Sequence, residues 1–235
     1  VDSTPPSAMT RQMVKLPAKT GVRLIDVFTP LCEGQRIGIF AGSGVGKSTL
    51  LSMLGGAHEF ETVVVVLVGE RGREVREFAE STLHKHPTRR ISVVATSDET
   101  PMMRRLAPRT GMRMAEYFRD RGENVLLIMD SVTRYAHACR DVALAAGEAP
   151  VARGFPPSVF TELPQLLERA GPGAIRGGFI TGIFSVLVDG DDHNDPVADA
   201  IRGTLDGHLV LSRQIAEQGR YPAVNLLASL SRLSH

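Results

Sequence analysis

The feature that most constrains the fold is a glycine-rich run, Ala41–Thr49, with the sequence AGSGVGKST. A short β-prone stretch, Arg36–Phe40, precedes the run, and a helix is expected to start near Lys47. This is the spacing of a P-loop, in which a glycine, four residues and Gly-Lys-Ser join a strand to a helix. Ala41 replaces the first glycine, at a position that tolerates a small side chain. The run therefore requires a strand, a tight loop and a helix in that order.

The residues of this loop are suited to bind the phosphates of a nucleotide. Glycines let backbone N–H groups turn toward phosphate oxygens, and the following helix adds the positive end of its dipole. The Lys47 ammonium can reach the β and γ phosphates, and the Ser48 hydroxyl can hold Mg²⁺. We therefore expect ATP and Mg²⁺ as ligands. The predicted nucleotide-binding residues in the loop are Gly42, Ser43, Gly44, Val45, Gly46, Lys47, Ser48 and Thr49.

Strand-like and helical segments alternate along the rest of the chain. The run Thr62–Val68 is β-branched or aliphatic throughout, as expected of a strand that is buried on both faces of a parallel sheet. Alternation of this kind predicts an α/β fold with a mainly parallel, twisted sheet and helices on both faces. The further predicted strands are 91–96, 125–130, 179–188, 208–211 and 223–227. The predicted helices are 73–83, 102–121, 131–146 and 158–170, with a short polar helix between the last two strands.

Length and composition exclude several classes of protein. The 235 residues suffice for one large α/β domain, which we place at 20–235 after a tail at 1–19. The longest apolar run falls far short of the ~20 residues that a membrane-spanning helix needs, and the first residues lack the pattern of a secretory signal. A net charge of +1 gives no basic footprint for nucleic acid. Cys32 and Cys139 lack metal-ligand spacing and are typical of buried thiols in the cytoplasm.

Two carboxylates are expected at the sheet edge that carries the P-loop, because parallel sheets bind ligands at the carboxyl ends of their strands. Asp130 ends an apolar strand, where a carboxylate can hold the Mg²⁺ shell through water; its alternative role is to cap the next helix. Glu70 follows the strand that ends at Val68 and can deprotonate the water that attacks the γ phosphate. The alternative for Glu70 is an exposed salt bridge with Arg71 or Arg73.

Several motifs, taken together and in order, resemble the ATPases of flagellar and type III protein export, which are relatives of the catalytic subunits of rotary ATP synthases. They are 42–50 (GSGVGKSTL), 68–75 (VGERGREV), 130–134 (DSVTR), 154–160 (GFPPSVF), 190–196 (GDDHNDP) and 229–232 (SLSR). The resemblance extends from about Thr20 to the end of the chain. The sequences at 42–46 and 194–196 are more similar to the flagellar branch than to the virulence branch.

This resemblance implies a RecA-like P-loop fold and the hydrolysis of ATP to ADP and phosphate, which energises protein export. It also implies a homo-oligomer, a hexameric ring in the full-length form. The expected partners are an export regulator, a stalk protein and chaperone-bound substrates, with peripheral association at the inner-membrane export gate from the cytoplasm and no nucleic acid. Family members carry a β-barrel domain before this core and a helical domain after it. We therefore expect the chain to be the ATPase core, mostly monomeric and slow by itself.

The resemblance also assigns roles to individual residues. Tyr221 matches the aromatic residue that packs on the adenine ring; its alternative is an ordinary core tyrosine. Arg134 matches a basic residue near the γ phosphate, against the alternative of a helix-surface arginine, and Arg71 is counted with Glu70 among the catalytic residues. Arg232 matches the arginine finger that one subunit inserts into its neighbour's site, which can be worth about 10³–10⁵ in rate. The alternative for Arg232 is a surface arginine.

Other functions remain open on the sequence alone. A hexameric nucleic-acid translocase on the same RecA-like core would need basic loops toward a central pore, and none is evident. A non-catalytic nucleotide-binding subunit could dispense with a base, so Glu70 argues against it. A secretion ATPase of the virulence type is the remaining alternative.

Replacement of Lys47 by alanine removes the ammonium that the loop directs at the β and γ phosphates. We expect Lys47→Ala to abolish nucleotide binding, as measured by calorimetric titration with ATP and Mg²⁺. Affinity equal to that of the parent chain would contradict the assignment of this loop to phosphate binding.

Overall fold

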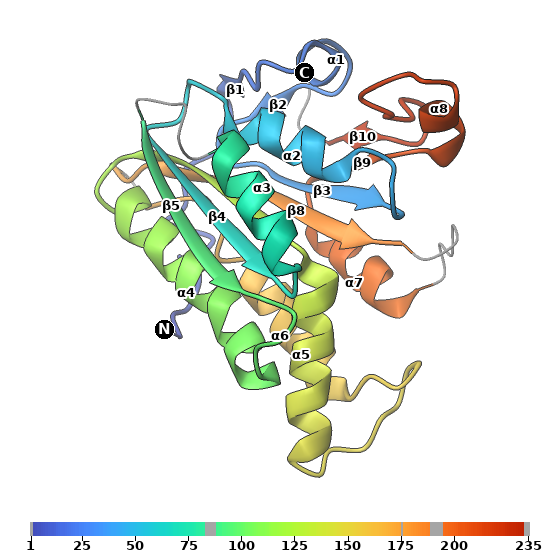
Figure 1. The fold of residues 1–235 in the computed structure, drawn as a ribbon. Coiled ribbons are helices and arrows are strands. Elements are labelled where there is room, and N and C mark those ends of the chain that lie inside the picture. The colour runs from blue at the N-terminus through green and yellow to red at the C-terminus, as the bar shows by residue number, and fades with distance from the viewer. Residues whose placement is uncertain (1, 83–87, 175, 189–194, 233–235) are drawn as a thin grey trace.

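The computed structural model describes residues 2–82, 88–174, 176–188 and 195–232, and a mostly parallel sheet with helices on both faces forms its centre (Figure 1). The strands are β1 (Pro17–Ala18), β2 (Leu31–Cys32), β3 (Arg36–Ala41), β4 (Thr62–Val68), β5 (Arg89–Ala95), β6 (Asn124–Asp130), β7 (Gly171–Pro172), β8 (Phe179–Leu187), β9 (Gly207–Val210) and β10 (Leu230–Ser231). The helices are α1 (Arg23–Phe28), α2 (Lys47–Gly55), α3 (Gly72–Thr82), α4 (Pro101–Arg119), α5 (Val132–Ala145), α6 (Pro157–Leu167), α7 (Pro196–Thr204) and α8 (Arg213–Glu217). None of these helices, in the part of the chain that the structure describes, has the length and apolar character needed to cross a membrane.

The strand order brings several strand ends to one edge of the sheet. The described sheet runs β10-β9-β3-β8-β6-β4-β5, and β7 pairs with β8 outside this path. The strands from β9 to β5 are parallel, whereas β10 is antiparallel to β9. The carboxyl ends of β3, β4, β6 and β8 therefore meet at the same edge, where parallel sheets bind ligands.

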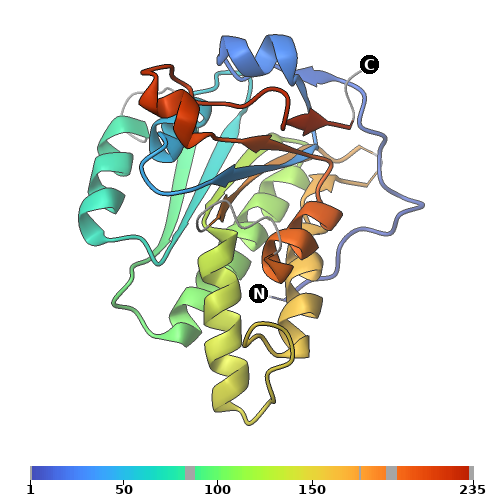
Figure 2. The same ribbon diagram turned by 90° about the vertical axis from the view of Figure 1, so that its right-hand side faces the viewer.

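The side chains of β4 pack alternately into two apolar cores. Val63 and Val65 belong to the core under α1, α2 and α3, whereas Val64 and Val66 belong to the core under α4, α5, α6 and α7. All four valines are fully buried, and each contributes about 1.5–3 kcal/mol by leaving water. Figure 2 shows α4, α5, α6 and α7 gathered on one side of the sheet. Burial on both faces explains why this strand has no polar alternation in the sequence.

The segment that the sequence predicts as a tail runs along the core. Asp2 forms an ion pair of 2.9 Å with Arg109, and the Ser3 hydroxyl donates a hydrogen bond of 2.8 Å to Glu116, both on α4. Farther on, the side-chain amide of Gln12 donates to the carbonyl oxygen of Gly177 at 2.7 Å. These contacts hold the segment against the α4 side of the molecule.

The predicted α/β fold is confirmed, and most predicted elements overlap observed ones. Helix α7 was not predicted. Its N-cap is Asp195, whose Oδ1 accepts the N–H groups of Val197 and Ala198 at 2.8 Å each. The polar residues around this cap masked a helix that carries only a narrow apolar stripe.

The strand predicted at 223–227 is wrong. Val224 makes only an isolated bridge with Leu211, and β9 pairs instead with β10. The Asn225 side chain accepts the N–H groups of Leu227 and Ala228 at 3.1 and 3.2 Å, which closes a turn where the apolar pattern predicted an extended chain.

Gly111 sets how closely α4 approaches β4. A Cβ at this position would lie 2.2 Å from Cγ2 of Val66. Alanine normally stabilises a helix interior by about 1 kcal/mol relative to glycine, but overpacking costs about 1–3 kcal/mol. We expect the clash to prevail, so that Gly111→Ala lowers the free energy of unfolding measured with urea.

Gly203 in α7 is the matched control, because a Cβ there meets no atom within 4 Å. Gly203→Ala should leave stability unchanged or raise it. A similar gain in both variants would contradict the close packing of α4 on β4.

Candidate nucleotide-binding and catalytic site

The glycine-rich loop connects β3 to α2. Gly44 and Gly46 have φ angles of 72° and 85°, in the left-handed region that residues with a Cβ avoid. Gly46 is also the N-cap of α2, and it has no side chain that could occupy the first N–H groups of the helix. The first turn of α2 can therefore offer its N–H donors, together with the positive end of the helix dipole, to a phosphate held in the loop.

Asp130 lies beside the P-loop at the end of β6. Lys47 Nζ approaches Asp130 Oδ1 to 2.5 Å, and the Ser185 hydroxyl on β8 donates to the same oxygen at 2.5 Å. Asp130 is buried, so the ammonium offsets the loss of water around the carboxylate. The alternative role of Asp130 as a helix cap is wrong, because Ser131 caps α5 by accepting the N–H of Arg134 at 3.3 Å.

Glu70 lies just past the end of β4, and its side chain is only 8% exposed. Its carboxylate forms an ion pair with Arg134 of α5 and lies 3.7 Å from Lys47 Nζ. The alternative of an exposed salt bridge with a neighbouring arginine is therefore wrong. The structure brings Glu70, Arg134, Lys47 and Asp130 together in one cluster, in which the two acidic groups are buried and the two basic groups are partly exposed.

The arginines that follow Glu70 in sequence point elsewhere. Arg73 pairs with Glu77 at 2.8 Å on the exposed side of α3. Arg71 is exposed, and its charge helps to lower the pKa of Glu74. Of the predicted catalytic residues, Arg71 is thus next to Glu70 in sequence, but it is exposed and lies near Glu74.

The environment of Glu70 changes its acidity. Burial raises the pKa of Glu70 to about 7, and a hydrogen bond with Glu74 and the charge of Asp130 act in the same direction. Lys47 and Arg134 lower the pKa and oppose these effects. A carboxylate with a pKa near neutrality is well matched to take up and release a proton at neutral pH.

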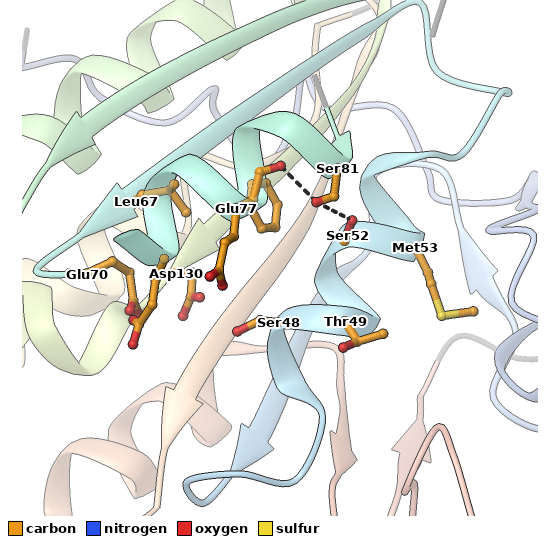
Figure 3. A pocket seen from close by; sticks show the side chains of 11 residues that line it. Ser48, Thr49, Ser52, Met53, Leu67, Glu70, Glu77, Ser81 and Asp130 are labelled. Atoms are coloured by element: carbon orange, nitrogen blue, oxygen red, sulfur yellow. Dashed lines mark hydrogen bonds between the residues drawn. The ribbon is translucent and has the colours of Figure 1, made fainter. Parts of the chain in front are cut away.

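A cavity of about 370 Å³ opens beside these side chains. Ser48 reaches toward it from α2, and Glu70 and Asp130 lie across from Ser48 (Figure 3). A hydroxyl and a carboxylate are oxygen donors of the kind that Mg²⁺ prefers. Among the described residues, no group of three or more His, Cys, Asp or Glu could hold a metal ion. The Ser48 hydroxyl and the Asp130 carboxylate fit Mg²⁺ as donors, with water and phosphate oxygens as its further ligands.

The two remaining predicted residues lie in different places. Ring carbons of Tyr221 are 3.2 Å from the position that a Cβ would take on Gly46, and the residue is 62% exposed. Tyr221 is thus beside the P-loop and is not a core tyrosine. Arg232 donates its backbone N–H to the carbonyl oxygen of Asp206 at 2.9 Å, next to the start of β3. Since β3 spans six residues, Arg232 lies roughly 17 Å from the P-loop of its own chain.

Sequence reasoning missed two residues that contact the site. Ser185 is a polar residue within the apolar run 183–188, and a buried hydroxyl in such a run signals a polar partner. Arg213 donates from its guanidinium to the carbonyl oxygen of Ser43 at 3.1 Å, and no local pattern marks it. Most of the motif at 190–196 lies outside the described residues.

A P-loop between a parallel strand and its helix, with one carboxylate at the end of β6 and another just past the end of the neighbouring β4, defines a RecA-like P-loop nucleotide-binding domain. Among known families, the model described as ATP synthase alpha/beta family, nucleotide-binding domain, matches residues 21–231. The chain belongs to this family, as the sequence motifs predict.

Individual relatives are similar over the whole chain. The flagellum-specific ATP synthase of Agrobacterium fabrum is 65% identical over 234 residues, which are 100% of this chain and 50% of the relative. That of Rhizobium meliloti is 66% identical over 234 residues, with the same coverage. The chain thus spans about half the length of the curated relatives it matches.

A solved structure shares the fold. The assembled ATPase EscN, in complex with its central stalk EscO from the type III secretion system of enteropathogenic E. coli, superposes with a TM-score of 0.90 at 51% identity. The match covers 99% of this chain and 55% of that chain.

The raised pKa of Glu70 makes stability depend on pH. The folded chain binds this proton more tightly than the unfolded chain, so the stabilisation is present below about pH 4.5 and is lost as pH rises through about 7. Glu70→Gln stays neutral. We expect the free energy of unfolding of Glu70→Gln, relative to the parent, to increase between pH 5 and pH 8.5.

Ser52→Ala, which alters the same cavity without a titrating group, is the control and should show no such trend. A difference between Glu70→Gln and the parent that stays constant with pH would contradict the assigned pKa.

Proposed function

We propose that this chain hydrolyses ATP, with Mg²⁺, to energise protein export of the flagellar type. The observation that carries the proposal is Glu70, a buried carboxylate with a pKa near 7 beside the P-loop and Asp130. Nucleotide binding alone needs no base at this position. A base beside the place for the γ phosphate favours hydrolysis over storage or sensing of the nucleotide.

Each residue of the cluster has a role in the proposed reaction. The loop N–H groups and Lys47 bind the triphosphate, for which Lys47 gives up its contact with Asp130. Ser48, and Asp130 through water, would hold Mg²⁺, whose charge would offset that of the phosphates. Glu70 accepts a proton from the attacking water while the bond to the γ phosphorus of ATP passes from ADP to that water. Arg134 is released from Glu70 to stabilise the negative charge of the γ phosphoryl group.

The position of Arg232 bears on assembly. It lies at the far end of β3 from the P-loop of its own chain, so a role as an arginine finger requires a second copy. We propose that copies form a ring, hexameric in the full-length form, in which Arg71 and Arg232 lie near shared sites and Tyr221 packs on the adenine ring. The similar protein EscN is an assembled ATPase with a central stalk, EscO, which supports an assembly with a stalk partner here.

The wider cellular role follows the relatives. Their names as flagellum-specific ATP synthases support the flagellar branch over a virulence-type system and over a nucleic-acid translocase. We propose an export regulator and chaperone-bound substrates as further partners. The proposed location is the cytoplasm, with peripheral association at the export gate of the inner membrane.

The test of hydrolysis is Glu70→Gln, which keeps the shape of the side chain but removes the base. We expect ATP affinity to stay within about threefold of the parent and single-turnover hydrolysis to fall by at least ~10², the lower range for loss of a general base. Phosphate release and calorimetric binding measure the two quantities on the same samples.

Retained hydrolysis in Glu70→Gln would place the base elsewhere. Stimulation of the parent's turnover by single-stranded RNA would instead favour a nucleic-acid translocase.

A further inference from the structure

The segment 211–224, between β9 and β10, folds over the P-loop. The N–H of Leu211 donates to the carbonyl oxygen of Phe40 at 2.9 Å, and the N–H of Ser212 donates to that of Ala223 at 2.8 Å. The two ends of the segment are thereby tied to each other, and its first residue is tied to the strand that leads into the P-loop. Between these ties lie α8 and the polypeptide that carries Tyr221.

This segment touches the P-loop at two points. Near the start of the loop, the Arg213 guanidinium donates to the Ser43 carbonyl oxygen at 3.1 Å. Near its end, the Tyr221 ring packs on Gly46. Arg213 is an exposed residue, so core packing does not force its contact with the loop.

The Ser43 carbonyl belongs to the peptide group whose N–H is that of Gly44. In a planar trans peptide the C=O and the N–H point in opposite directions. A guanidinium that holds the carbonyl on the outer side of the loop therefore directs the Gly44 N–H to the inner side. Gly44 has a φ of 72°, and a glycine does not keep one peptide orientation by itself.

We propose that Arg213 is a positioning residue for the phosphates, because it fixes the peptide between Ser43 and Gly44 with its N–H turned into the loop. The inference rests on the proposed binding of a nucleotide and adds a residue from outside the P-loop to it. Since the fixed group faces phosphate, the contribution of Arg213 is the same for ATP and for inorganic tripolyphosphate, which lacks the base and the sugar. A residue that acted through Tyr221 would affect ATP alone.

The test compares Arg213→Met, Arg213→Lys and the parent chain. One charge-assisted hydrogen bond at an exposed position corresponds to about a 3- to 10-fold change in affinity. We expect Arg213→Met to weaken the binding of ATP and of tripolyphosphate by this same factor. Arg213→Lys, which keeps a cationic donor, should recover part of the affinity.

Arg220→Met, an exposed arginine of the same segment, is the matched control and should bind both ligands as the parent does. Unchanged affinity in Arg213→Met, or a loss confined to ATP, would overturn the inference while leaving the proposed function intact. A parent chain that binds neither ligand would overturn both. Thermal unfolding of each variant verifies that the comparison is made on folded chains.

Discussion

The arrangement of the site depends on the buried pairing of Lys47 with Asp130. The two groups approach to 2.5 Å, and Asp130 is only 3% exposed, so neither charge has a full water shell to return to. A buried charge that loses its partner costs about 3–5 kcal/mol, which means that the P-loop cannot leave β6 unless other charges replace the pair. Phosphates can supply negative charge for Lys47, and a divalent cation can supply positive charge for Asp130. The pair thus holds the P-loop next to the end of β6.

Burial also changes the pKa of Glu70. Glu70 shares its pocket with Asp130, and both burial and that negative charge favour its protonated form, whereas Lys47 and Arg134 oppose this. A bound triphosphate would add negative charge and Mg²⁺ would add positive charge, so the two would act on the pKa of Glu70 in opposite directions.

The sequence predicts those parts of the fold and site that depend on local pattern. The continuous apolar run of β4 specifies a strand buried on two faces, and the P-loop spacing specifies strand, loop and helix. The rule that parallel strands bind ligands at their carboxyl ends then places Glu70 and Asp130 together. Contacts between distant segments escape such reasoning. The bond from Arg213 to Ser43 spans 170 residues, and the Asn225 turn overrides an apolar run that is typical of a strand.

The place of Arg232 has a consequence for symmetry. The P-loop and Arg232 lie at opposite ends of β3, so a contact that joins Arg232 of one copy to the P-loop of the next connects two different surface patches. A two-fold dimer could make this contact only if both patches lay in one self-complementary interface, whereas a head-to-tail contact joins them without that requirement. In the proposed ring, head-to-tail contacts of this kind would close, and each copy would both give an arginine and receive one. Every site would therefore be complete only in a closed ring. An open chain of copies would always leave one site at its end without its arginine.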